Sequence, residues 1–346
     1  MLKLVNSKLR GVFEMQKFEL LSYSEEKLLS EEQRTKYYEE LRNILKKRKM
    51  KVTTPGALTI APKLKGITGK IAQKVSAILA GGDMEIICDG TENIPLGAVL
   101  FACTHQGIMD NFVWIPSCPR HCVILHAKDV NKLLLLAQIN TGLVLVSQDV
   151  DDVENRKNAK LDMIHILLNG HAIRYFPEGA WNLSPNKLHL PMSYGFLEIA
   201  QKSGAPVIPV VTEHTYDTST EKERILKTHI RYGKPISVGI KDDLSTKLLE
   251  FEEAISTIRW ELMEEKGLFS RNQITNIDYI NYLKGNLHNF ELGNKDVKRE
   301  RGRIRGAKLE FYKFHHINDV PWDAWGNFCL TDETKRLECL RRFHGI

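Results

Sequence analysis

The chain has 346 residues and a net charge of +6, with 42% hydrophobic and 27% charged residues. This length can bury one large α/β core with added elements, or two ordinary domains, and the composition excludes a low-complexity protein. The longest apolar run, Leu133 to Val146, is interrupted by polar residues and is too short for a membrane-spanning helix. The N-terminus lacks the apolar run and cleavage site of a secretory signal, so we expect a cytoplasmic protein.

The six cysteines are scattered along the chain, as is typical of reduced thiols in a cytoplasmic protein. Cys118, His121 and Cys122 lie close together, but no second pair of ligands follows at the spacing of a zinc site. We therefore expect no metal.

Two helices are predicted before residue 83. The segment Ser24 to Lys49 begins with a capping serine and two glutamates and ends in a Lys/Arg cluster, which suits the dipole of a helix. The segment Gly66 to Ala80 has apolar residues at helical spacing, and these are Ile67, Ile71, Val75, Ile78 and Leu79. Ten basic and no acidic residues lie between 41 and 82, which leaves the rest of the chain with a net charge of −4.

From residue 84 onward, short apolar runs alternate with helical segments. The predicted strands are Met84 to Cys88, Ala98 to Cys103, Cys122 to His126, Leu143 to Ser147, Ala172 to Phe176, Val207 to Thr212, His229 to Tyr232 and Ile236 to Val238. The predicted helices between them are Asp129 to Ile139, Asp151 to Asn169 and Met192 to Ser203. This alternation predicts an α/β fold with a largely parallel sheet flanked by helices, whose functional sites gather at the carboxyl ends of the strands.

The strand pattern stops near Lys241, and Leu244 to Glu265 is predicted as an amphipathic helix. The remainder is polar and aromatic, and its basic run Lys298 to Lys308 suits a solvated loop, an acidic protein, a phosphate group or a lipid surface. We therefore expect three parts: a helical, basic N-terminal region over 1–83, an α/β domain over 84–240 and a helical extension over 241–346.

A histidine and an aspartate follow the second predicted strand, in the stretch "THQGIMD". His105 and Asp110 are five residues apart, so His105 must precede a helix while Asp110 sits in its first turns, with Gly107 allowing the bend. A carboxylate that accepts from one ring nitrogen fixes the tautomer of the imidazole and leaves the other nitrogen basic. The pair is therefore a candidate general base, and a histidine that only caps a helix is the alternative.

The stretch "FPEG" ends a later strand and should open on the same edge of the sheet. Pro177 makes the exit from Phe176 rigid, Glu178 offers an acceptor for orienting hydrogen bonds, and Gly179 allows backbone to approach a ligand closely. Together with the upstream His/Asp pair, this combination is far more specific than either motif alone.

In the order and spacing of these motifs, residues 84 to 239 resemble the glycerolipid and lysophospholipid acyltransferase family. "HQGIMD" is similar to its H-x4-D motif, "TGLVLVSQD" occupies the second motif, "FPEG" the third and "APVIPVV" the fourth. The resemblance implies that the α/β domain is catalytic. It would transfer a fatty acyl group from acyl-CoA or acyl carrier protein to an acceptor hydroxyl, without an acyl-enzyme and without any metal or redox cofactor.

The resemblance also implies roles for single residues. His105 would deprotonate the acceptor hydroxyl and Asp110 would orient His105, as in the family motif. Residues expected to contact substrate are Gly107, Gln148, Arg174, Phe176, Pro177, Glu178, Gly179, Trp181 and Asn182.

Two arginines that bind phosphate in relatives acting on glycerol phosphates are missing here. Gln148 stands in the second motif, and Trp181 and Asn182 follow "FPEG". Neither side chain replaces the charge and bidentate fork of a guanidinium, although Arg156, Lys157 or Arg174 can compensate from another direction. We therefore expect an acceptor that is a lysophospholipid-like or related polar lipid and that differs from simple glycerol 3-phosphate or lysophosphatidic acid. The alternatives are a glycolipid, sugar or amine acceptor, or an inactive lipid-binding scaffold.

We expect the basic, amphipathic region 41–82 to hold the enzyme peripherally on the inner face of a membrane, because lysines are attracted to anionic lipids and apolar side chains insert at the interface. In the alternative, the apolar face of Gly66 to Ala80 packs on the α/β domain. Acyl carrier protein is a possible partner. Nucleic acid is not expected, since no nucleic-acid-binding motif accompanies the basic segments.

Overall fold

The structure is a computed structural model, and it describes residues 20–51, 84–105, 109–127, 144–149, 152–179, 192–217 and 224–265, together with 67, 69–71, 73–74, 77–78 and 189. The predicted helix Asp129 to Ile139, the basic run Lys298 to Lys308 and the rest of the C-terminal extension beyond 265 lie outside these residues.

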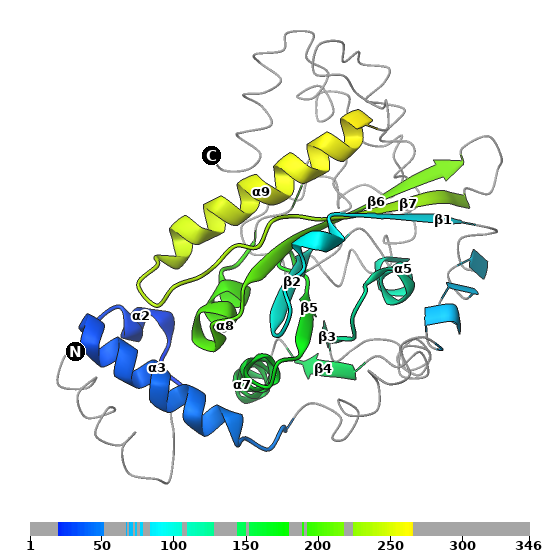
Figure 1. Ribbon diagram of the computed structural model, residues 1–346. Helices are drawn as coiled ribbons and strands as arrows, with labels where there is room; N and C mark the ends of the chain where they lie inside the picture. Colours follow the sequence, from blue (N-terminus) through cyan, green and yellow to red (C-terminus); the bar gives the residue numbers. More distant parts are fainter. Residues whose placement is uncertain are drawn as a thin grey trace, which may run out of the picture.

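The described strands form one seven-stranded sheet in the spatial order β1-β7-β6-β2-β5-β3-β4 (Figure 1). Their bounds are β1 (Glu85–Asp89), β2 (Val99–Cys103), β3 (Cys122–Ala127), β4 (Val144–Gln148), β5 (Ala172–Tyr175), β6 (Val207–Asp217) and β7 (Arg224–Tyr232). Strands β2 to β6 run parallel, while β7 pairs antiparallel with β6 and β1 runs parallel to β7. The predicted α/β fold with a largely parallel sheet is confirmed.

The central strand β2 is buried at every position, which explains why its sequence is an uninterrupted apolar run. Strand β6 extends five residues beyond the predicted end at Thr212, because it leaves the parallel part of the sheet and continues in an antiparallel pair with β7. The sequence of this part of β6 is polar, so no apolar run marks it as a strand. The segment Ile236 to Val238 contributes one isolated bridge, Ile236 to Val207, and is not a full strand.

Helices cover both faces of the sheet. Helix α5 (Met109–Ser117) packs with Val99, Phe101 and Ile208 on one face. Helices α7 (Val153–Leu168), α8 (Gly195–Ser203) and α9 (Leu244–Glu265) pack on the other face (Figure 1). The helices predicted for 151–169, 192–203 and 244–265 are thus present, with α8 starting three residues late.

The predicted helix Ser24 to Lys49 is two helices, so the prediction of one continuous helix is wrong. Helix α2 (Tyr23–Glu26) is capped by Ser22 and helix α3 (Glu31–Lys46) by Ser30, each with a complete capping box. Ser30 has an extended backbone, and its side chain accepts from the Gln33 amide at the start of a new helix, which favours a break between the two.

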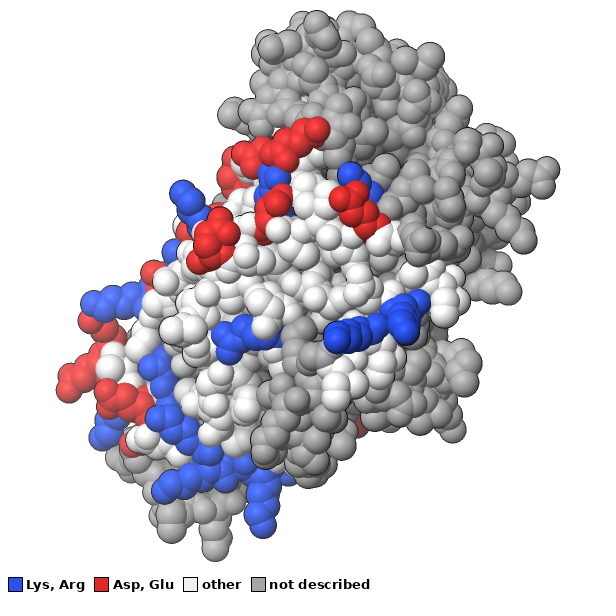
Figure 2. Space-filling model, turned by 45° about the vertical axis from the view of Figure 1, so that its right-hand side comes forward, with Lys and Arg blue, Asp and Glu red and all other residues white. Residues whose placement is uncertain are grey.

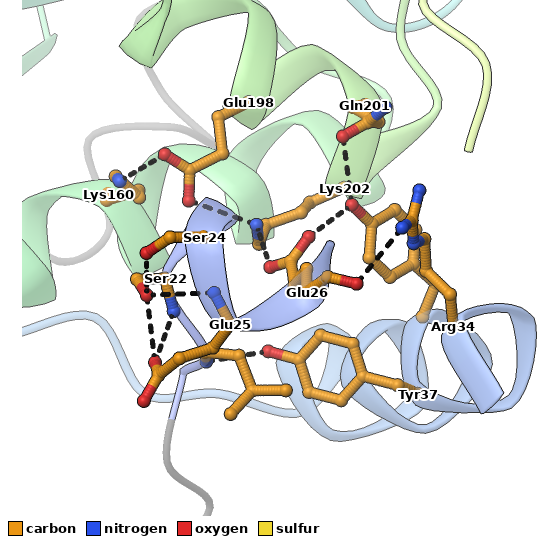
Figure 3. A network of polar contacts seen from close by, with 12 residues as sticks. Ser22, Ser24, Glu25, Glu26, Arg34, Tyr37, Lys160, Glu198, Gln201 and Lys202 are labelled. Carbon is orange, nitrogen blue, oxygen red and sulfur yellow. Dashed lines mark hydrogen bonds and ion pairs between the residues drawn. The ribbon is translucent and has the colours of Figure 1, made fainter. Parts of the chain in front are cut away.

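A buried polar network attaches α2 and α3 to α8 (Figure 3). The Lys202 side chain is completely buried and pairs with Glu26 of α2 and with Glu198, 3.0 Å away. The Tyr38 hydroxyl of α3 donates to Glu26 at 2.7 Å, and Glu198 also pairs with Lys160 at 2.6 Å. Burial alone would raise the pKa of Glu198, but the two lysines outweigh it and lower that pKa.

The apolar sides of these two helices join the main hydrophobic core through Leu21, Tyr37, Tyr38, Leu41 and Leu45. Helices α2 and α3 therefore fold together with the α/β domain. The boundary at residue 83 stays a prediction.

The described residues between 67 and 78 are helical, as predicted for Gly66 to Ala80. This helix lies beside α5, since a Cβ on Gly69 would come 4.0 Å from the Cα of Pro116 (Figure 1). Within the described part of the chain, no helix has the length and hydrophobicity needed to cross a membrane.

Candidate active site

Two adjacent strands deliver the candidate residues to one edge of the sheet. Strand β2 ends at Cys103 and is followed by His105, while its neighbour β5 ends at Tyr175 and is followed by Phe176. The exit of β2 is tied to β6, because the Thr104 amide donates to the Val210 carbonyl and the Thr104 hydroxyl accepts from the Thr212 amide. The predicted meeting of the two motifs at one edge is therefore observed.

His105 and Asp110 form the hydrogen bond that their spacing predicts. His105 Nδ1 lies 2.9 Å from Asp110 Oδ2; the aspartate side chain is completely buried, and the histidine side chain is 13% exposed. Asp110 is the second residue of α5, so the first turn of this helix holds the carboxylate under the imidazole. The imidazole remains within reach of a substrate.

The backbone of His105 is held by the third motif. The His105 amide donates to Glu178 Oε1 at 3.0 Å, so Glu178 joins the two strand exits. Gly179 has φ +68° and its amide donates to the Phe176 carbonyl, which closes a turn that a residue with a side chain would adopt only with strain. Pro177, Glu178 and Gly179 thus support the histidine from the side.

The environment sets the ionisation of the pair. Burial alone would raise the pKa of Asp110, but hydrogen bonds from His105 and His214 outweigh burial and hold that pKa well below its usual range. Burial lowers the pKa of His105, against the opposing effect of Asp110 and with help from the positive charge of Arg174. Near neutral pH the site therefore contains a carboxylate and a neutral imidazole, the ionisation that a general base needs.

Arg174 is one of the residues that we expect to contact substrate or to compensate for a missing phosphate-binding arginine. Its side chain is completely buried, with its guanidinium 4.4 Å from the Phe176 ring and 4.7 Å from the Trp114 ring. The Phe176 ring in turn stacks on His105 at 3.8 Å between centroids. Arg174 donates to Asn111 at 3.1 Å, while its Nε and Nη2 have no hydrogen-bond partner among the described residues. It lies behind the histidine and is not placed to bind a phosphate group.

The thiol nearest the site is poorly suited to act as a nucleophile. Cys103 is fully buried in β2, and burial raises the pKa of its thiol to about 12. Its interpretation as a packing residue agrees with this position.

A second histidine contacts Asp110 and was missed by the sequence motifs. His214 Nε2 lies 3.2 Å from Asp110 Oδ1, and the His214 side chain is completely buried. Val210, Thr212 and His214 are two residues apart along β6, so His214 lies on the same face of the sheet, which α5 covers. Strand alternation would have found it if β6 had been predicted at its full length.

The remaining predicted residues lie away from the pair or outside the described chain. Gln148 ends β4 at the edge of the sheet, separated from β2 by two strands and hence by roughly 14 Å. Gly107, Trp181 and Asn182 lie outside the described residues. Also among the described residues, no group of three or more His, Cys, Asp or Glu side chains is arranged to hold a metal ion.

The fold and the geometry of the His105–Asp110 pair agree with the resemblance to acyltransferases. Residues 85–213 match the family model described as Acyltransferase. The chain therefore carries an acyltransferase domain that runs from β1 into β6, and the resemblance inferred from the motifs is confirmed over these residues. No curated protein matches the chain.

Among solved structures, the chain is similar to the 1-acyl-sn-glycerophosphate (LPA) acyltransferase PlsC from Thermotoga maritima. The sequence identity is 18% and the TM-score 0.43, and the match covers 71% of this chain and 87% of that chain.

Proposed function

We propose that the protein transfers a fatty acyl group from a thioester of coenzyme A or acyl carrier protein to a hydroxyl of a lysophospholipid-like or related polar lipid. The observation that carries this proposal is the hydrogen bond between His105 Nδ1 and the buried Asp110 carboxylate at the end of β2. It supports a role for His105 as a base, because a neutral imidazole held by a carboxylate accepts a proton at its other nitrogen.

In the proposed reaction, His105 Nε2 accepts the proton of the acceptor hydroxyl while the oxygen attacks the thioester carbonyl. A C–O bond forms, and the tetrahedral intermediate then collapses as the C–S bond breaks. The imidazolium gives its proton to the leaving thiolate, so the products are the ester and the free thiol. Asp110 stabilises the imidazolium throughout, and general-base catalysis of this kind contributes about 10²–10⁴-fold in rate.

The burial of Arg174 bears on the acceptor. Of the three basic residues considered as replacements for the missing phosphate-binding arginines, Arg174 is enclosed by Trp114 and Phe176. This favours a second candidate, in which the acceptor is a glycolipid, a sugar or an amine without a phosphate near the reacting group.

Acyl transfer by the purified protein tests both candidates. Radiolabelled acyl-CoA and acyl carrier protein thioesters would each be offered with lysophosphatidic acid, with a lyso-glycolipid and with a long-chain amine. Efficient esterification of lysophosphatidic acid would support the first candidate and contradict the second, in which the acceptor has no phosphate near the reacting group.

The His105→Ala variant separates an enzyme from a scaffold. We expect its transfer rate to fall by at least about 10²-fold, while the protein stays folded and its lipid binding is unchanged. A cellular function that survives this substitution would contradict catalysis.

We further propose that the basic, amphipathic region 41–82 binds the inner face of a membrane. Ile67, Ile71 and Ile78 are 63%, 46% and 78% exposed, which supports a free apolar face and disfavours packing of these residues on the α/β domain. Lys70 and Lys74 of the same helix are exposed, as are Lys46, Lys47, Lys49 and Lys51 near the end of α3. In the view of Figure 2, basic side chains gather along the lower part of the described surface, and acidic side chains lie towards the top and along the left.

Liposome flotation tests the membrane proposal. Deleting the whole region would remove the core residues Leu41 and Leu45, so the better variant replaces Ile67, Ile71 and Ile78 by serine. We expect it to lose binding to anionic vesicles, while the matched control replaces Leu96, Val153 and Leu249, which are also exposed, and keeps binding. Equal flotation of the two variants would contradict the proposal.

A further inference from the structure

We propose that His214 is a positioning residue of the acyl-transfer site, which holds the Asp110 carboxylate against His105 and is itself oriented by Thr228. The role of His214 in catalysis rests on the proposed function. The contacts that His214 makes with Asp110 and Thr228 do not depend on that function. His214 also lies one residue past the end of the segment that matches the acyltransferase family model.

The three residues are joined across three elements. Each oxygen of the Asp110 carboxylate on α5 faces a different histidine, with His105 Nδ1 at 2.9 Å from Oδ2 and His214 Nε2 at 3.2 Å from Oδ1. The other nitrogen of His214, Nδ1, lies 2.8 Å from the Thr228 hydroxyl on β7. His214 and Thr228 are register partners of the antiparallel β6–β7 pair, so the sheet itself places them opposite each other.

Counting protons gives the direction of the hydrogen bonds. The Thr228 hydroxyl has one proton and two neighbouring acceptors, His214 Nδ1 and the Met84 sulfur at 3.3 Å. An imidazole nitrogen is a better acceptor than a thioether, so the hydroxyl donates to Nδ1 and the proton of neutral His214 lies on Nε2. If the hydroxyl donated to Met84 instead, Nδ1 would have to donate to the hydroxyl oxygen. His214 would then carry protons on both nitrogens, because Nε2 still faces the Asp110 carboxylate. In either case a Nε2–H group points at Asp110.

This second donor has a physical consequence for the base. A carboxylate bound through one oxygen can rotate about its side-chain bond, whereas donors on both oxygens fix its plane and therefore the ring that it holds. Asp110, His214 and Thr228 are each completely buried, so little water competes for the carboxylate. Among the described residues, Arg174 of β5 and Glu178 of the turn after β5 also lie near His105, and neither has a described hydrogen bond to the second oxygen of Asp110.

A purely structural role is the competing explanation, since a buried histidine between β6 and α5 can serve packing alone. The variants His214→Phe and His214→Gln separate the two. Phenylalanine keeps the ring volume and removes the donor, while glutamine places an amide N–H near the position of the imidazole Nε2. Thr212→Val is the matched control, because Thr212 is buried on the same face of β6 and its hydroxyl has no hydrogen-bond partner among the described residues.

In acyl-transfer assays we expect His214→Phe to lower kcat by about 10- to 100-fold, the range for losing a hydrogen bond to a charged group, with KM unchanged. His214→Gln should restore most of the rate, and Thr212→Val should behave like the wild type. Thr228→Val should lower kcat in the wild-type background and have no further effect in His214→Phe. A His214→Gln variant as slow as His214→Phe, or equal losses in kcat and in folded fraction, would overturn the proposal.

Nitrogen NMR of the full chain with labelled histidine tests the positioning without any substrate. We expect the His214 Nε2 proton to be present, and the titration midpoint of His105 to move to higher pH in His214→Phe and to return in His214→Gln. The reason is that Asp110, without its second donor, attracts the His105 proton more strongly. An unchanged His105 titration in His214→Phe would overturn the positioning even if the protein transferred acyl groups. A shifted titration in a protein without transferase activity would support the positioning and refute the proposed function.

Discussion

Asp110 is the residue on which the site depends, because its carboxylate connects the candidate base to the rest of the fold. It is fully buried and ionised, and its hydrogen bonds from two histidines outweigh the cost of that burial. A buried charge is tolerated only when its acceptors are satisfied, so the histidines serve the stability of the site as well as its chemistry.

Replacing Asp110 by asparagine removes this negative charge. We expect kcat to fall by about 10²–10⁴-fold, because an asparagine neither stabilises the imidazolium nor selects the correct tautomer. The pKa of His105, already lowered by burial, should fall further, since Asp110 is the group that raises it. The acid limb of the pH–rate profile should therefore move to lower pH, opposite to the shift expected for His214→Phe, and a shift to higher pH would contradict this assignment.

Arg174 should affect His105 through charge. Its guanidinium lies behind Phe176 and lowers the pKa of His105, so Arg174→Met should raise that pKa and move the loss of activity on the acid side to higher pH. Because two guanidinium nitrogens are buried without partners among the described residues, we expect little loss of stability. Arg174→Lys keeps the charge and is the control. If the pKa of His105 is the same in the two variants, the electrostatic explanation is wrong.

At the scale of elements, the short helices α2 and α3 act as part of the α/β domain. Helix α3 contributes Tyr38 and Leu41 to the core of this domain, and Glu26 of α2 pairs with Lys202 on α8. The break between the two helices follows from two consecutive capping boxes, at Ser22 and Ser30. The sequence contains both, but the prediction of one long helix did not take the second into account.

Lys202→Met tests this attachment. It leaves Glu26 and Glu198 buried without their shared cation, and breaking a buried pair in this way costs about 3–5 kcal/mol. Urea unfolding measures the loss, and Lys241→Met is the control because the Lys241–Glu31 pair is 72% and 65% exposed. Equal midpoints for the two variants would show that the network does not stabilise the fold.

At the scale of the whole molecule, the sequence predicts the sheet and the His105–Asp110 pair because both depend on local patterns. Apolar runs mark the buried strands, and a five-residue spacing places an aspartate in the turn of helix after a histidine. The contacts of His214 and Arg174 depend on which strands are neighbours, and no local pattern contains that information. Sequence patterns therefore do not reveal His214 as a partner of Asp110 or the burial of Arg174 behind Phe176.

The whole molecule also relates the proposed membrane helix to the site. The described residues between 67 and 78 lie beside α5 at Gly69, and α5 is the helix that carries Asp110 in its first turn. A lipid acceptor reaching the base from a surface bound by Ile67, Ile71 and Ile78 would therefore arrive at the side of the sheet on which α5 lies.

Contacts at the candidate active site depend on the register in which β6 pairs with β7. In the observed register His214 faces Thr228 and Asp110, while Glu213 points to the opposite face and pairs with Arg259. A slip of one residue would exchange the two faces, bring Glu213 against buried Asp110 and separate Glu213 from Arg259. Two buried carboxylates repel each other, so a chain that pairs these strands wrongly is destabilised. The residues that hold the base thereby also discriminate against misaligned folding.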